Sequence, residues 1–137
     1  MSAPLDLLRA VPLFVDLEDR ELEMLARQLH ERRSPEGAAV TSEGSTGAGF
    51  FIIAEGNANV TVGGVHKATL GPGDYFGEIA LIDDGVRSAS IVAATDLLLY
   101  GLTPWEFRPF VEEHPKVAWA LLQTLARRFR EAQAAAS

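Results

Sequence analysis

Cysteine is absent from the sequence, so neither a disulfide framework nor a thiolate zinc site is possible. Long hydrophobic runs are also absent, and none approaches the roughly 20 residues needed to cross a bilayer. There is no secretory signal, because Asp6, Arg9 and Asp16 interrupt the apolar N-terminus. We therefore expect a cytoplasmic protein that does not use a membrane as its partner.

Basic residues are few: 12 Lys and Arg stand against 19 Asp and Glu, for a formal net charge of −7. Nucleic acids and anionic membranes are bound by basic surfaces, so this balance disfavours both as the main partner. A small anion is not excluded, since it requires only one well-placed arginine.

The 137 residues, 47% of them hydrophobic, are sufficient for one domain with its own core. We predict three parts within this single domain: N-terminal helices over 1–33, a β-barrel over 34–102 and C-terminal helices over 103–137. In the first part Asp16 is the expected helix cap. The helix that begins after Asp16 carries Leu22, Leu25, Ala26 and Leu29 on one face.

The middle part alternates short β-like runs with glycine-bearing turns. Gly63-Gly64 lies between two of these runs and predicts a hairpin. Many short, evenly spaced strands favour a sandwich or jelly-roll barrel, so the fold class is mainly β with flanking helices. The predicted strands are 38–41, 50–54, 57–62, 65–70, 87–94 and 97–102.

Two helices are expected at the C-terminus. The first begins at Thr103-Pro104-Trp105-Glu106, with a Thr cap, Pro at the first helical position and Glu three residues after the cap, and it runs to about Glu113. His114-Pro115 breaks the chain direction, because the residue before Pro is disfavoured in the α region. The second helix runs from about 115 to 135. Its apolar face could cover the barrel, pair with a second copy of the chain, or do both. This face comprises Ala118, Leu121, Leu122, Leu125, Ala126 and Phe129.

The most informative stretch is Phe76-Gly77-Glu78-Ile79-Ala80-Leu81, followed after a short gap by Arg87-Ser88-Ala89-Ser90. Gly77 lets the backbone approach a ligand, and a helix starting after it would direct free N–H groups towards an anion. Arg87 offers a planar fork of donors for a phosphate, whereas ionised Glu78 only accepts hydrogen bonds, as from a sugar hydroxyl. Phosphate plus sugar hydroxyl indicates a nucleotide. The alternative is an ordinary Glu78–Arg87 ion pair beside a tight turn.

This order of residues closely resembles the phosphate-binding cassette of cyclic nucleotide-binding domains, of the type found in catabolite activators and in cyclic-nucleotide-dependent kinases. The resemblance extends from about Leu8 to Gln133. It implies that Glu78 accepts the ribose 2′-hydroxyl, that Arg87 pairs with the cyclic phosphate and that neighbouring amides flank that phosphate. The ligand-binding residues it implies are Phe76, Gly77, Glu78, Ile79, Ala80, Arg87, Ser88 and Ala89.

On the base side the resemblance is less complete. Val60 and Phe76 lie where relatives place apolar contacts to the nucleotide, and Ile91, on the same strand face as Arg87 and Ala89, could border the base. Plain core packing is the alternative for all three. Ala126-Arg127-Arg128-Phe129 resembles an Ala-Arg-Arg-Leu stretch of the family's long helix. By that match Arg128 and Phe129 could cover the pocket; otherwise the arginines simply face solvent near the helix C-terminus.

Two features of the sequence bear on which base is bound. Where the bacterial activator has a hydroxyl pair that reads the adenine edge, this sequence has Ala132 and Gln133. The Arg-Ser-Ala order at Arg87 to Ala89 is usual among bacterial cyclic-AMP binders, so cAMP is the expected ligand, with cGMP the second option. No DNA-reading helix-turn-helix follows within these residues, and the downstream effector is not indicated.

The leading interpretation is therefore a non-enzymatic sensor, without a further cofactor, in which nucleotide binding repositions the long C-terminal helix. One alternative keeps the fold as a ligand-free module that dimerises through the 121–129 face. The other is a metal-dependent, cupin-like enzyme, which would have to bring together His30, His66 and His114 from scattered positions.

Overall fold

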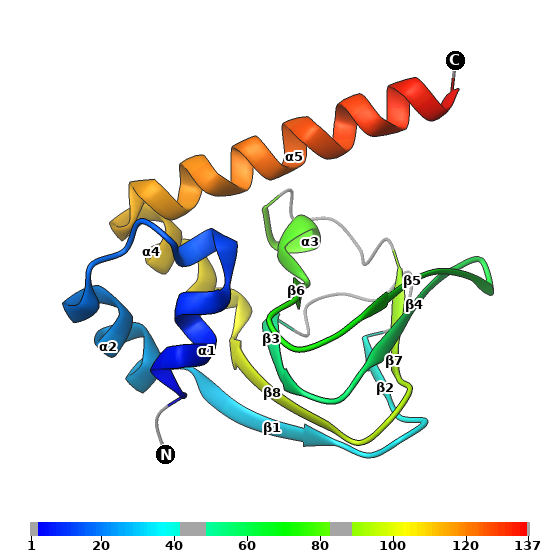
Figure 1. Cartoon of the computed structure of the whole chain (residues 1–137), viewed down its shortest axis with the longest axis horizontal. Coiled ribbons are helices and arrows are strands. Elements are labelled where there is room, and N and C mark those ends of the chain that lie inside the picture. Colours follow the sequence, from blue (N-terminus) through cyan, green and yellow to red (C-terminus); the bar gives the residue numbers. More distant parts are fainter. Residues whose placement is uncertain (1–2, 42–48, 83–88, 137) are drawn as a thin grey trace.

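The computed structural model describes residues 3–41, 49–82 and 89–136. Two antiparallel four-stranded sheets form a sandwich, and helices gather at one end of it (Figure 1). The long C-terminal helix begins at the helical end and crosses the top of the molecule in this view towards the side of the strands. The expected jelly-roll architecture with flanking helices is thus confirmed.

The first sheet has the strand order β1-β8-β3-β6 and the second has the order β2-β7-β4-β5. Neighbours in each sheet lie far apart in sequence, as in a jelly roll. The first sheet comprises β1 (His30–Ser34), β8 (Leu97–Leu102), β3 (Phe50–Glu55) and β6 (Tyr75–Phe76). The second comprises β2 (Ala39–Thr41), β7 (Ser90–Ala93), β4 (Ala58–Val62) and β5 (Val65–Leu70).

One core cluster lies between the sheets, and alternate residues of the strands supply it. Its buried members are Val40, Phe51, Ile53, Ala58, Phe76, Ile91, Ala93, Leu97 and Leu99. Gly101 makes room for one of them, because a Cβ at that position would lie 2.5 Å from the ring of Phe51. The same ring contacts Phe76, with centroids 5.6 Å apart.

A second cluster joins the helices to the outer side of the first sheet. Its largest fully buried side chains include Phe14, Leu25, Phe50 and Val117. The helices are α1 (Leu5–Ala10), the 3-10 turn η1 (Pro12–Phe14), α2 (Asp19–Gln28), α3 (Glu78–Ile82), α4 (Pro104–Glu113) and α5 (Pro115–Ala136).

Three details of the sequence-based prediction are wrong. The N-terminal helical segment does not reach residue 33: α2 ends at Gln28, and His30–Ser34 form the edge strand β1. This strand is mostly exposed, so it lacks the apolar alternation of a strand, and its pairing with the buried strand β8 sets its conformation. The cap of α2 is Glu18 rather than Asp16, and the two-residue strand β6 was not predicted.

Several local predictions are confirmed. Gly63 and Gly64 form the turn between β4 and β5, both with positive φ. Thr103 caps α4 in a capping box with Glu106, and the chain breaks at His114 before α5 begins. The predicted strand 87–94 is observed as β7 from Ser90, while Arg87 and Ser88 lie outside the described residues.

Candidate functional site

The site is organised by the turn between β6 and α3. Gly77 has a φ of 97°, a left-handed conformation that a side chain would strain. The turn lets α3 begin directly at Glu78, as the sequence predicted. Because β6 pairs with β3 in the first sheet, this turn is held at a fixed place beside the sandwich.

Glu78 is buried, with 4% of its surface exposed. Its Oε1 lies 3.2 Å from Nη1 of Arg128 on α5. Its Oε2 is also buried, yet among the described residues it has no hydrogen-bond partner. A buried acceptor left without a donor costs free energy, so this oxygen is suited to a donor that a ligand brings.

Helix α5 reaches the site at two successive turns. Arg128 contacts Glu78, and Thr124, one turn earlier, lies near the hydroxyl of Tyr75. Burial raises the pKa of Tyr75, although the side chain of Thr124 opposes that shift. Figure 1 shows α5 passing over α3.

Tyr75 and Thr124 were not among the residues predicted from sequence. Tyr75 directly precedes the predicted cassette, and Thr124 stands four positions before Arg128. Residues four apart share one helix face, so the choice of Arg128 already implied that Thr124 faces the same way.

The predicted apolar contacts lie together in the core cluster between the sheets. Phe76 and Ile91 are buried there, and half-buried Val60 packs against it. Val60 and Ile91 are also cross-strand partners in β4 and β7. All three therefore have a packing role in this structure.

The remaining predicted residues fall into three groups. Phe129 is 63% exposed, and Ala132 and Gln133 are exposed as well. Ala89 is half-buried just before β7. Arg87 and Ser88 lie outside the described residues, and for Ile79 and Ala80 only the helical backbone of α3 is described.

Comparison with known proteins identifies the family. The profile described as "Cyclic nucleotide-binding domain" matches residues 31–114 of this chain. The chain belongs to the cyclic nucleotide-binding domain family. The matched range contains the Gly77 turn, Glu78 and the sequence of the whole predicted cassette.

Individual relatives of this cyclic nucleotide-binding domain support the same family assignment. The cyclic AMP receptor protein of Thermus thermophilus is 35% identical over 130 residues, which cover 91% of this chain and 60% of that protein. A cyclic nucleotide-gated potassium channel of Rhizobium etli is 36% identical over 89% of this chain and 34% of the channel. The solved structure of the Thermus thermophilus catabolite activator protein superposes with a TM-score of 0.81 at 35% identity, covering 89% of this chain and 60% of that chain.

This chain therefore spans 60% of the length of the first relative and about a third of the second. These two relatives are named as a receptor protein and as a potassium channel, so the similarity extends to proteins of different kinds. In the described part of this domain, no helix is long and apolar enough to cross a membrane.

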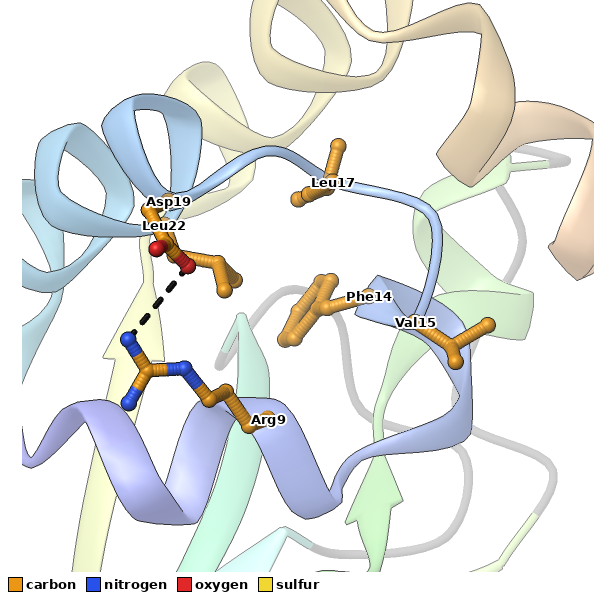
Figure 2. A pocket seen from close by; sticks show the side chains of 6 residues that line it. All are labelled: Arg9, Phe14, Val15, Leu17, Asp19 and Leu22. Atoms are coloured by element: carbon orange, nitrogen blue, oxygen red, sulfur yellow. Dashed lines mark hydrogen bonds and ion pairs between the residues drawn. The ribbon is translucent and has the colours of Figure 1, made fainter.

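A separate hollow of about 270 Å³ opens among α1, η1 and the start of α2 (Figure 2). Phe14, Leu17 and Leu22 supply its apolar wall, and an Arg9–Asp19 ion pair of 3.4 Å crosses its rim. None of the described cassette residues lines it.

The histidines do not form a metal centre. Across residues 3–41, 49–82 and 89–136, no group of three or more metal-binding side chains occurs. Each histidine instead has its own polar partner: His30 meets Glu106, His66 meets Thr69 and His114 meets Glu21. The cupin-like alternative gains no support from this arrangement.

Proposed function

We propose that this domain is a regulatory sensor that binds a cyclic nucleotide, with cAMP as its preferred ligand. The observation that carries the proposal is the buried Oε2 of Glu78, an acceptor that lacks a partner among the described residues. A carboxylate in this position accepts a hydroxyl hydrogen bond, and the ribose 2′-hydroxyl of a cyclic nucleotide supplies one.

The other half of the ligand is assigned to the cassette. Arg87 binds the cyclic phosphate with its planar fork of donors, and the backbone of residues 76–80, with Ser88 and Ala89, lies against the same phosphate. Val60, Ile91 and Arg128 border the base. The preference for cAMP rests on the Arg-Ser-Ala order at 87–89 and on the names of relatives such as the cyclic AMP receptor protein.

Helix α5 carries the output. Because Arg128 contacts the carboxylate that receives the ribose, a ligand that changes this contact also changes the position of α5. For such a switch the ligand must have different affinities for the two helix positions. The helix then transmits the signal to an effector or to a second copy of the chain, within a cytoplasmic protein.

A second copy is the partner that the exposed side of α5 favours. Trp119, Leu122 and Phe129 are exposed large apolar residues on this helix, and Ala126 completes a spacing of three, four and three residues. That spacing is the seam of a two-stranded coiled coil. The face differs from the expected 121–129 face, because Leu121 is buried against the domain itself.

A thermal-shift comparison with cAMP, cGMP and plain AMP tests the proposal. We expect the largest rise in melting temperature with cAMP, a smaller one with cGMP and almost none with AMP, because a ligand that binds only the folded state stabilises it by mass action. If none of the three shifts the melting temperature, the domain is a ligand-free interaction module. A rise with AMP equal to that with cAMP would contradict recognition of the cyclic phosphate.

A further inference from the structure

Both capping boxes of the helical layer involve a histidine from elsewhere in the chain. In α2, Glu21 Oε1 accepts the backbone N–H of Glu18 at 3.1 Å, while its Oε2 lies 2.8 Å from Nδ1 of His114. An ionised carboxylate only accepts hydrogen bonds, so Nδ1 of His114 carries the proton.

The capping box of α4 repeats this arrangement. Glu106 Oε1 accepts the N–H and the hydroxyl of Thr103 at 3.0 and 2.7 Å, and Nε2 of His30 lies 2.9 Å from the same oxygen. His30 follows the end of α2, and His114 caps the end of α4. The start of each helix is therefore bound to the end of the other.

His114 is packed between Glu21 of α2 and Phe110 of α4. Its side chain is 13% exposed and its ring lies 4.7 Å from that of Phe110. The charged groups near the pair are Glu21 itself and Lys116 of α5. The amine of Lys116 donates to the backbone carbonyl of Asp16 at 3.3 Å, whereas Glu21 is the carboxylate that His114 contacts directly.

The surroundings of His30 are simpler. Its side chain is 62% exposed, and Glu106 is the charged group that it contacts within the described residues. The neighbouring charges have other partners: Glu31 accepts the hydroxyl of Tyr100 at 3.4 Å, and Arg32 lies over the ring of Phe51 at 5.3 Å. The more exposed pair contributes less, because solvent screens it.

We propose that the pairs His114–Glu21 and His30–Glu106 form a proton-sensitive clamp, in which protonated histidines hold α4 to α2 and neutral histidines loosen that contact. A hydrogen bond between an imidazolium and a carboxylate is stronger than one from a neutral ring. Histidine generally changes charge between about pH 5 and pH 8. The clamp should therefore hold α4 to α2 in mildly acidic solution and loosen at higher pH.

The clamp acts at the N-terminal end of α5. His114 directly precedes Pro115, the first residue of α5, and α4 ends at Glu113. Fixing α4 to α2 therefore fixes the end of α5 that lies away from Glu78, and the contact between Arg128 and Glu78 holds the helix further along. Any effect of pH on nucleotide affinity rests on the proposed function, whereas the clamp itself does not.

The test compares the chain with the double variant His30→Gln/His114→Gln. We expect the unfolding equilibrium constant of the variant, divided by that of the unchanged chain, to be about fivefold larger near pH 5.5 than near pH 8. The reason is that both partners of each pair are charged only at the lower pH. His66→Gln is the matched control, since His66 lies on β5 and contacts Thr69 of the same strand, and its ratio is expected to be the same at both pH values. Equal ratios for the double variant would overturn the proposal.

A second measurement reports on the contact itself, without nucleotide. Because the chain lacks cysteine, Glu23→Cys on α2 and Glu113→Cys on α4, both exposed positions, can carry a single pair of spin labels. We expect a narrow distance distribution near pH 5.5 that broadens near pH 8 and in the double variant at either pH. A distribution whose width does not respond to pH or to the double variant would overturn the clamp even if nucleotide binding is intact.

Discussion

Arg128 on α5 and Glu78 on α3 are separated by 50 positions in sequence, yet their side chains form an ion pair of 3.2 Å. The glutamate is buried and the arginine is half-exposed, so the pair lies at the boundary between the cassette and solvent. The arginine occupies one carboxylate oxygen and leaves the other directed inward without a partner among the described residues. The pair thus holds a buried acceptor beside α5, and under the proposed function this acceptor receives the ligand.

The first prediction concerns the free energy of this pair. Arg128→Gln removes the charge that neutralises buried Glu78, and we expect the ligand-free domain to lose about 1–2 kcal/mol of unfolding free energy. Breaking a fully buried pair costs more, but Arg128 is half-exposed and screened by solvent. Urea denaturation measures the change. Arg127→Gln, one residue away and exposed, is the control and is expected to change stability by less than about 0.5 kcal/mol.

The second prediction concerns the free oxygen of Glu78. If it receives the ribose hydroxyl, 2′-deoxy-cAMP leaves it unpaired on binding, and we expect affinity to fall about 5- to 100-fold relative to cAMP, measured by calorimetry. In Glu78→Gln the two ligands should differ much less, because the charged acceptor is gone. Equal affinities of the unchanged domain for both ligands would remove Glu78 from ribose recognition.

The third prediction concerns Arg87. We expect Arg87→Ala to weaken cAMP binding by roughly 2–5 kcal/mol, a loss of about thirtyfold or more, because a desolvated phosphate loses its charged donors. Arg87→Lys should recover part of the loss, since lysine keeps the charge but not the planar fork. Arg130→Ala, an exposed arginine of α5, is the calorimetric control. Unchanged affinity of Arg87→Ala would contradict the assigned phosphate site.

The sequence predicts several local features of the fold well because each depends on residues close together in the chain. The Gly77 turn, the helix beginning at Glu78 and the capping box at Thr103 depend on residues within a few positions of one another, and all are present. The same holds for the hairpin at Gly63-Gly64. Each of these features follows from backbone preferences that need no tertiary information.

The errors arise where partners distant in sequence decide the structure. Strand β1 is exposed and polar, and only its pairing with β8, some 70 residues away, makes it a strand. Likewise, the spacing of α5 gives the correct helix but not which apolar residues face the domain: Leu121 is buried, whereas Phe129 is exposed. The partnership of His114 with Glu21 has no local signal at all.

The fourth prediction concerns acid stability. Partial burial by itself raises the pKa of Glu106, but hydrogen bonds from Thr103 and His30 outweigh it and hold the pKa below the ordinary value. The backbone N–H of Glu18 and then His114 lower the pKa of Glu21. A carboxyl group with a lowered pKa stabilises the fold fully above its ordinary value and loses that effect as pH falls through the folded value.

We therefore expect the stability advantage of the unchanged chain over Glu106→Gln to shrink as pH falls from about 5 to about 3. Urea denaturation at several pH values measures it. Glu131→Gln on the exposed end of α5 is the control, and its free energy of unfolding should equal that of the unchanged chain at every pH. An advantage that grows on acidification would contradict the lowered pKa of Glu106.

The fifth prediction concerns the exposed side of α5. Trp119, Leu122 and Phe129 together present an apolar seam, and burying it in a second copy removes this surface from water. We expect the chain to be a dimer by light scattering and Leu122→Glu to be a monomer, because a charge in the seam would be buried without a partner. Gln123→Glu places the same charge one position away on an exposed site and should leave the dimer intact. If both variants keep the mass of the unchanged chain, the seam serves a partner other than a second copy.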